Sequence, residues 1–250
     1  VDFMRVLVPM AGDDTTPEGE QVNIYGNHVG SWNFAATAYL NRWKVKIYYE
    51  HYFDDHSQMF FQYGRWKDGH IGLEITFPKN RFIDTFVYEG LGTKDQTGPM
   101  LYDSFWGKFE EQISAKDNYY NHYLYQGWQH WGMGIGNPLL PGPIYNKNGQ
   151  ITFISNRVLA HHIGFCGSPC QSLSYRMLLS YSRHWGTYDN PLNEIKKQFN
   201  SLFEVTYAPQ QLKGWSFTVS GAMDRGSMLG NNYGGMLVIR KQGIIKSGNK

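Results

Sequence analysis

The sequence has no long hydrophobic run. No stretch approaches the roughly 18 consecutive apolar residues that mark a membrane-spanning helix, and the mean hydropathy is −0.49. Charged residues make up only 18% of the chain, and the formal net charge is +2. These absences exclude a helical membrane protein. They also argue against a nucleic-acid partner, because nucleic-acid-binding surfaces are strongly basic.

Cysteine is scarce, with only two residues, Cys166 and Cys170. They flank Gly-Ser-Pro, which we expect to form a tight turn. Their spacing matches neither the thioredoxin motif nor a zinc-ligand pattern. Two alternatives follow: a disulfide that closes the turn in an oxidising compartment, which we favour, or two free thiols. We expect no metal site and no cofactor.

The start of the chain has none of the features of a signal peptide, and the first residues are Val-Asp rather than Met. We therefore expect a mature form or a fragment. A length of 250 residues suits one large all-β domain. We expect residues 1–250 to form a single domain.

Strict alternation of apolar and polar residues is the strongest positive signal. Two such runs lie between Trp32 and Phe53 and are hinged at Asn41-Arg42. Alternate side chains of a strand point to opposite faces, so each run has one apolar and one polar face. Each run has about ten residues, enough for a tilted strand to cross a bilayer, and Trp and Tyr lie near its ends. The pattern predicts an antiparallel transmembrane β-barrel. The alternative is a soluble β-sandwich or propeller with long strands.

Further strand-like runs bring the expected total to about ten or eleven. They lie at His70–Phe77, Phe82–Leu91, Tyr119–Trp131, Ile151–Phe165, Tyr175–Trp185, Phe203–Tyr207, Trp215–Ser220 and Tyr233–Lys241, with a short one at Met59–Tyr63. We expect long connections at 92–117, 134–150 and 187–198, the last with a short helical turn at Asn193–Phe199. A simple up-and-down count does not place all these long connections at one end of a barrel.

Six strings occur in an order that resembles the Wzi family of capsule assembly proteins of Gram-negative outer membranes. They are YGNHVGSW at 25–32, YEGLGTKDQTG at 88–98, DNYYNHYLYQGW at 117–128, GNPLLPGP at 136–143, SNRVLAHHIG at 155–164 and SYSRHWGTY at 180–188. The resemblance implies an outer-membrane barrel of about 18 strands, occluded by loops and small helices. It also implies a lectin-like role in retaining capsular polysaccharide. Because the strand count falls short of that number, we expect this chain to be the C-terminal portion of a longer family member.

Aromatic and amide residues suited to sugars are mixed in one segment. Sugar C–H faces lie on aromatic rings, and their hydroxyls pair with amides and carboxylates. An aromatic girdle at the membrane interface has a similar composition and is the structural alternative. The segment contains Tyr119, Tyr120, Tyr123, Tyr125, Trp128 and Trp131 among Asn118, Asn121, Gln126 and Gln129. Of these, Tyr119, Tyr120 and Asn121 are our candidate carbohydrate-binding residues.

Charged residues of two loops complete the candidate site. Lys94, Asp95 and Gln96 lie in a Gly-flanked loop and match the TKDQTG part of the family string. They are predicted either to hold an acidic polymer or to tie the loop to the rim. Arg157 adds a guanidinium that can recognise carboxylates. The structural alternative is that arginine side chains inside the predicted barrel pair with glutamate side chains inside it.

Catalytic motifs are absent from the sequence. Ser180, Ser182 and His184 share a strand face, but no nucleophile elbow is present. Adjacent His161 and His162 point to opposite faces of a strand and cannot grip one metal ion together. We therefore expect a non-enzymatic protein of the bacterial outer membrane whose partners are surface polysaccharide and lipid. The alternatives are a porin or transport channel and a secreted glycan-processing enzyme.

Overall fold

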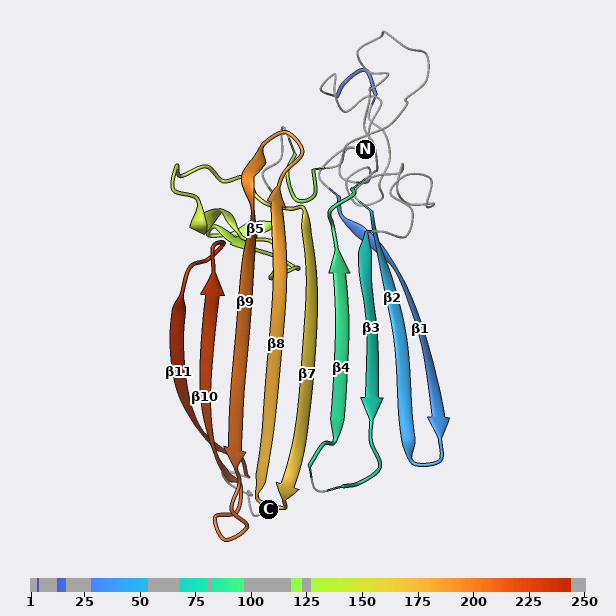
Figure 1. Ribbon diagram of the computed structural model, residues 1–250, viewed down its shortest axis with the longest axis vertical. Coiled ribbons are helices and arrows are strands. Elements are labelled where there is room, and N and C mark those ends of the chain that lie inside the picture. Colours follow the sequence, from blue (N-terminus) through green and yellow to red (C-terminus); the bar gives the residue numbers. More distant parts are fainter. Residues whose placement is uncertain are drawn as a thin grey trace, which may run out of the picture.

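The computed structural model describes residues 4, 13–16, 28–53, 68–80, 82–96, 118–122 and 127–243. Within them the architecture is all-β, as predicted, and is dominated by one antiparallel sheet of nine strands (Figure 1). In sheet order these are β1 (Gly30–Leu40), β2 (Trp43–Phe53), β3 (Gly69–Thr76), β4 (Thr85–Gly92), β7 (Val158–Cys170), β8 (Leu173–Gly186), β9 (Pro191–Tyr207), β10 (Trp215–Gly226) and β11 (Asn232–Lys241). Every strand therefore pairs with its neighbours in the order of the chain, as in repeated hairpins.

The first hairpin forms where the alternation predicts it. Strands β1 and β2 pair antiparallel over their full lengths, from Gly30 opposite Phe53 to Leu40 opposite Trp43. The turn at residues 41–42 contains Asn41 with a φ of 56°. Asn tolerates this left-handed conformation, which two-residue hairpin turns of the preferred types require.

The prediction for residues 187–199 is wrong. Strand β9 begins at Pro191, so the expected helical turn at Asn193–Phe199 is strand, and the connection shrinks to residues 187–190. Charged and polar residues occupy most of 193–198, which hides the alternation. The predicted strand Met59–Tyr63 lies outside the described residues.

With β9 beginning at Pro191, all the long connections join strands at the same end of the sheet. We call one end of the sheet the cap end (top in Figure 1). The strands are joined there by residues 54–68, 93–157, 187–190 and 227–231. Turns 41–42, 77–84, 171–172 and 208–214 join them at the other, the turn end. Long loops at one end and short turns at the other are typical of up-and-down sheets and of outer-membrane barrels.

Strand β7 passes through both cysteines, so the predicted tight turn between them is absent. The hairpin turn instead lies at residues 171–172, and a register shift occurs between Gly167 and Cys170. Both thiols are free. Positions four apart on one strand are separated by roughly 10–13 Å, whereas the Cα atoms of a disulfide lie within about 7 Å. The disulfide that we favoured from the sequence does not form in this structure.

The sheet has one apolar and one polar face. We define the apolar face as the side of the sheet that carries Trp43, Ile47, Leu179, Phe203 and Leu237. The alternate residues on this side include no Asp, Glu, Lys or Arg along a stretch of each of the strands β2 to β4 and β7 to β11. The ranges without such a residue are 43–49, 71–75, 86–90, 161–165, 175–181, 199–207, 215–223 and 233–239. The charged strand residues between these ends all lie on the other side, the polar face.

Aromatic rings border the apolar face at both ends. Trp43, Phe165, Tyr207 and Trp215 lie toward the turn end, and Trp32, Tyr49, Tyr181, Phe199 and Tyr233 lie toward the cap end. Trp32, Trp43 and Trp215 are 42%, 42% and 39% exposed. A sandwich would bury these rings between two sheets. Here the nine strands form a single sheet instead.

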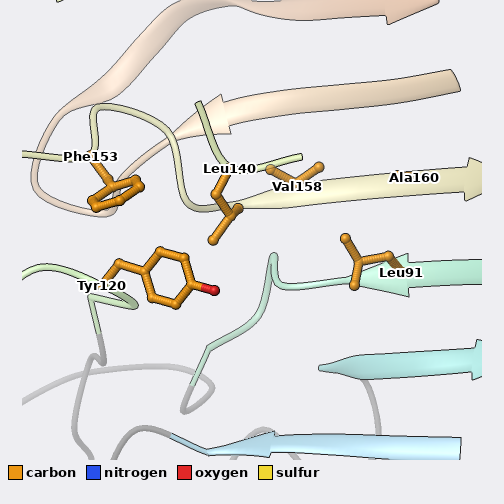
Figure 2. Packing of buried hydrophobic residues seen from close by; sticks show 6 residues of the cluster. All are labelled: Leu91, Tyr120, Leu140, Phe153, Val158 and Ala160. Atoms are coloured by element: carbon orange, nitrogen blue, oxygen red, sulfur yellow. The ribbon is translucent and has the colours of Figure 1, made fainter. Parts of the chain in front are cut away.

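Residues 118–122 and 127–157 form a cap at the cap end of the sheet. The cap contains the short hairpin β5 (Gln129–His130) and β6 (Met133–Gly134) and the 3-10 turn η3 (Pro143–Tyr145). Its apolar residues pack against the ends of β4 and β7, where the hydrophobic core lies (Figure 2). The core consists of Leu91, Tyr120, Leu140, Phe153, Val158 and Ala160. Within the described residues, no helix has the length and apolar character needed to cross a bilayer.

Candidate functional site

A cavity of about 690 Å³ separates the cap from the polar face of the sheet. Its strand side carries the polar groups, which come from Ser31, Glu50, His70, Glu89, His162 and Ser180, beside the apolar side chains of Leu91 and Ala160. Its cap side is largely apolar and is formed by Tyr119, Tyr120, Pro138, Leu139 and Leu140. A concave site with a few convergent polar groups on one wall and apolar groups on the other is the usual form of a small-molecule site.

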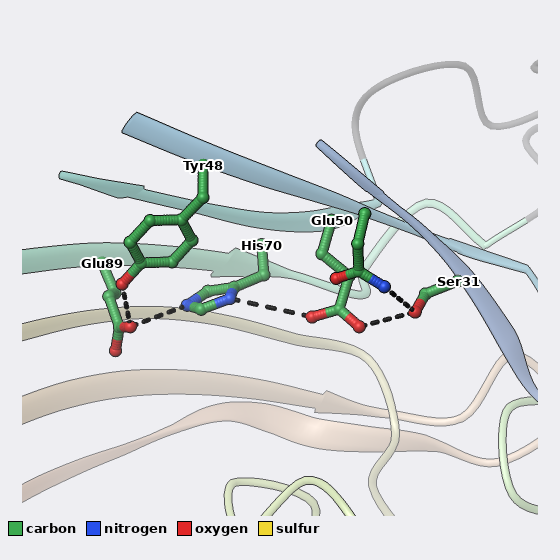
Figure 3. Close-up of polar contacts among 6 residues, drawn as sticks. Ser31, Tyr48, Glu50, His70 and Glu89 are labelled. Carbon is green, nitrogen blue, oxygen red and sulfur yellow. Dashed lines mark hydrogen bonds and ion pairs between the residues drawn. The ribbon is translucent and has the colours of Figure 1, made fainter. Parts of the chain in front are cut away.

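A chain of polar contacts joins residues of the four strands β1 to β4 on the floor of the cavity (Figure 3). The Ser31 hydroxyl donates to Glu50 Oε1 at 2.6 Å. His70 lies between two carboxylates, with Nδ1 3.9 Å from Glu50 Oε2 and Nε2 3.5 Å from Glu89 Oε1. The Tyr48 hydroxyl donates to the same Glu89 Oε1. The imidazole thus links Glu50 of β2 to Glu89 of β4.

The strand register brings these residues together. Glu50 is opposite His70 on neighbouring strands, and Glu89 is opposite His162. Directly opposite residues share a face, with Cβ atoms about 4.5–5.5 Å apart. His162 is in turn opposite Ser180, and its Nδ1 lies 2.6 Å from the serine hydroxyl. Sequence reasoning missed this group, because its members come from separate strands.

Asp68, which directly precedes β3, binds two segments at the cap end of the sheet. Its carboxylate is 1% exposed. The Tyr119 hydroxyl donates to Oδ2 at 3.0 Å, and the Asp95 amide donates to Oδ1 at 3.0 Å. Burial raises the pKa of Asp68 to about 7, although these hydrogen bonds act in the opposite direction. Asp68 therefore changes charge near neutral pH at the point where two loops meet.

The predicted residues Lys94 and Asp95 of the TKDQTG loop contact residues at the cap end of the sheet. Arg157 Nε donates to the Lys94 carbonyl at 3.1 Å, and its guanidinium lies 4.0 Å from the Tyr188 ring centroid. The Lys94 ammonium lies 5.2 Å from the Trp185 ring centroid. The Tyr188 hydroxyl donates to the Asp95 carbonyl at 3.0 Å. These contacts hold the loop against Arg157, Trp185 and Tyr188 at the cap end of the sheet.

Gln96 is completely buried, and among the described residues neither of its side-chain amide atoms has a hydrogen-bond partner. Its φ of 45° places it in the left-handed region. Unpaired buried amides are costly, by roughly 1–3 kcal/mol. The TKDQTG loop therefore includes a buried polar group that its surroundings leave unsatisfied.

The predicted aromatic residues of the cap are largely structural. Tyr119 and Tyr120 are 4% and 8% exposed. Tyr120 stacks on Trp128 with centroids 5.6 Å apart, and its hydroxyl accepts a hydrogen bond from the Asn137 amide at 3.0 Å. Asn121 exchanges two hydrogen bonds with the backbone of Phe153, at 2.9 and 2.8 Å. The two tyrosines line the cavity, but neither ring is an open platform on the surface. Tyr123, Tyr125 and Gln126 lie outside the described residues.

Two other aromatic side chains of the cap are open to solvent. Trp131 is 86% exposed and Tyr145 is 60% exposed. Trp131 lies in the β5–β6 turn with a φ of 52°, and His130 packs against it edge-on. Trp131 belonged to the predicted aromatic segment. Tyr145 was missed, because it stands alone in a Pro- and Gly-rich stretch.

An amide-rich groove of about 1130 Å³ lies between the cap and the β8–β9 connection. Side-chain amides on its walls can both donate to and accept from hydroxyls. They come from Asn118, Asn121, Asn148, Gln150, Asn190 and Asn193. Asn148, Gln150, Asn190 and Asn193 are exposed. This groove brings together residues 118–122, 148–154 and 187–193, which no sequence motif connected.

The serine and histidine side chains on β8 form a pair without a third group. Ser182 Oγ lies 2.9 Å from His184 Nε2, and the two residues are 1% and 2% exposed. His184 Nδ1 has no hydrogen-bond partner. A catalytic triad needs a residue that orients the histidine and a nucleophile that the substrate can reach. Within the described chain, no group of three or more His, Cys, Asp or Glu residues is arranged to hold a metal ion.

Comparison with known proteins leaves the family open. No family model, curated protein or solved structure matches this chain.

Proposed function

We propose that this chain is part of an outer-membrane β-barrel of the Wzi type that binds exported surface polysaccharide through its cap. The observation that carries the proposal is the apolar face, which runs across the strands without an Asp, Glu, Lys or Arg residue between its aromatic borders. A soluble protein rarely exposes so large an apolar surface. Lipid is the environment that matches it.

The spacing of the aromatic borders supports the membrane assignment. Phe199, at the middle of β9, and Tyr207, at its turn end, bound the part of its apolar side that has no charged residue. At about 3.3 Å per residue they are about 26 Å apart along the strand, or about 20 Å along the membrane normal at a tilt of roughly 40°. The apolar band of outer-membrane barrels is about 25 Å tall.

The cap supplies the groups for polysaccharide. Trp131 and Tyr145 present exposed rings, and the amide-rich groove presents four exposed amide side chains. Each such contact with a sugar is weak, but a polymer engages many of them on many copies of the protein, and avidity multiplies the effect. No step of bond cleavage is needed for this role.

The test uses the full protein in encapsulated cells. Replacing Trp131 and Tyr145 with Ala is expected to release capsule into the medium while the protein level in the outer membrane stays normal. Tyr39→Ala is the matched control, because Tyr39 is 75% exposed on β1 beside the turn at the opposite end of the sheet. Equal capsule retention in the double variant and the control would remove the cap surface from the proposal.

A channel function is the rival, and conductance decides it. The purified protein reconstituted in planar bilayers is expected to show no steady ion conductance, because the cap and its core occupy the cap end of the polar face. Stable open-channel currents would favour a transport channel instead.

A further inference from the structure

We propose that the cavity beneath the cap is a second binding site, for one or two sugar units that carry no negative charge, with preference for a sugar that bears a free amine. This site is distinct from the exposed cap residues. The inference does not depend on retention of the polymer.

The size and the two-sided lining of the cavity indicate a small organic ligand. A volume of about 690 Å³ lies within the range of roughly 300–1,000 Å³ that is usual for small-molecule sites. The polar wall presents carboxylates, imidazoles and serine hydroxyls, and the opposite wall presents Leu139, Leu140 and Tyr120. A pyranose ring has hydroxyls around its edge and C–H groups on its faces, so the two walls match the two kinds of sugar surface.

The charge of the lining selects against acidic sugars. Among the described residues that line the cavity, Glu50 and Glu89 are the carboxylates, and no Lys or Arg is present. The cations of the nearby loops are engaged elsewhere, Lys94 over Trp185 and Arg157 over Tyr188. A uronic acid would bring its carboxylate toward two others without an arginine to bind it, whereas an ammonium group would be attracted.

Glu89 retains acceptor capacity for such a ligand. The contacts from His70 and Tyr48 both fall on its Oε1. None of the other residues drawn in Figure 3 contacts its Oε2. A carboxylate offers about four lone-pair positions, so Oε2 is the atom we assign to the sugar amine or hydroxyl.

The GNPLLPGP segment shapes the other wall. Gly136 has a φ of 92°, and a Cβ atom there would lie 2.7 Å from the Tyr120 hydroxyl oxygen. This glycine lets the chain pass close to Tyr120, whose hydroxyl then accepts the Asn137 amide at 3.0 Å. The turn directs Pro138, Leu139 and Leu140 to the cavity. The segment thus has a function that its composition alone did not reveal.

The experiment is calorimetry on the full protein purified in detergent, titrated with three disaccharides: a glucosamine dimer, cellobiose, and a disaccharide that contains glucuronic acid. We expect the amine to bind most tightly, the neutral sugar more weakly and the acidic sugar least. Glu89→Gln keeps the shape of the side chain and is expected to weaken binding of the amino sugar about tenfold, because one charge-assisted hydrogen bond is lost.

Two further variants keep the test decisive. Glu204→Gln is the matched control: Glu204 also lies on the polar face, where it contacts Arg176 at 3.3 Å, but it does not line the cavity. Glu50→Gln gives a second isosteric change inside the cavity if Glu89→Gln does not fold. Absence of binding for all three sugars, tighter binding of the acidic sugar, or equal losses in the cavity variant and the control would each overturn the proposal. Loss of capsule retention in the Trp131 and Tyr145 variant with unchanged disaccharide binding would separate the two sites.

Discussion

At the scale of single residues, the cap is held by contacts that depend on protonation. Asp68 accepts the Tyr119 hydroxyl and the Asp95 amide in a site from which water is excluded. Most surface carboxylates keep a pKa near 4, and this one is displaced because burial penalises its charge. The two loops that it joins, 93–96 and 118–122, border the cavity through Thr93 and Tyr119. Protonation of Asp68 therefore affects how the two loops that line the proposed site are held together.

We expect the stability of the cap to fall as the pH rises from about 4 to above 7. The pKa of Asp68 is raised from 3.8 in the unfolded chain to about 7 in the folded protein. Its contribution is therefore fully present below the unfolded pKa and is lost as the pH passes the folded pKa. The loss amounts to at most a few kcal/mol. Hydrogen exchange of cap amides at pH 5 and pH 8 measures it.

Asp68→Asn is the variant that isolates this effect. The amide oxygen still accepts from the Asp95 amide, and the amide nitrogen faces the Tyr119 hydroxyl. Because Asn has no charge to lose, we expect equal protection of the cap at both pH values. A variant that keeps the pH dependence of the parent would assign the effect to another group.

At the scale of elements, the strands owe their position to the alternation of side chains. Leu178 and Leu179 are neighbours on β8 with opposite environments. Leu179 is opposite Ile163 and Ser201 on the apolar face, and Leu178 is opposite Gly164 and Leu202 on the polar face. The two residues are of the same type, adjacent on the same strand and at nearly the same position along it, so a comparison of them differs only in the face of the sheet.

We expect Leu179→Arg to prevent stable insertion into the membrane and Leu178→Arg to be tolerated. An arginine on the lipid face near the midplane costs about 2–4 kcal/mol, whereas the polar face accommodates charge. The amount of folded protein in the outer membrane, measured by resistance to protease, gives the comparison. Equal levels for the two variants would contradict a lipid environment for the apolar face.

The first hairpin was predictable because strict alternation extends over both of its strands and an Asn-containing turn separates them. The start of β9 was not, because Glu194, Lys196 and Lys197 give residues 193–198 a largely polar composition. The Glu50–His70–Glu89 group was missed for a different reason. Its members are far apart in the sequence, and only the pairing register of β2, β3 and β4 places them side by side.

Segments without regular structure were the least predictable. The run Tyr119–Trp131 appeared strand-like, but Tyr120, Trp128 and Trp131 have positive φ values and the strand β5 covers only Gln129–His130. Aromatic side chains favour strands on average, but here Tyr120 and Trp128 are placed by stacking in the cap. Tertiary packing thus overrode the local preference, and it buried the two tyrosines that composition had favoured as sugar platforms.

At the scale of the whole molecule, the proposed membrane environment imposes a requirement on the edges of the sheet. Strands β1 and β11 are the two ends of the strand order in the described residues, and each pairs there with one neighbour. In hydrocarbon, an unpaired backbone amide costs several kcal/mol, so a spanning sheet is viable only as a closed barrel. The edges must therefore find partners in the same chain, in a longer form of it, or in another copy.

We expect the amides of β1 and β11 that face away from β2 and β10 to be protected from hydrogen exchange in the protein extracted from outer membranes. Closure gives each of these amides a carbonyl partner and excludes water from it. The amides of Gln210, Gln211 and Lys213 serve as the reference for free exchange, because they lie in the turn 208–214 and donate none of the backbone hydrogen bonds found among the described residues. Edge amides that exchange as fast as that reference would mean an open sheet, and an open sheet of this composition has no stable place in a bilayer.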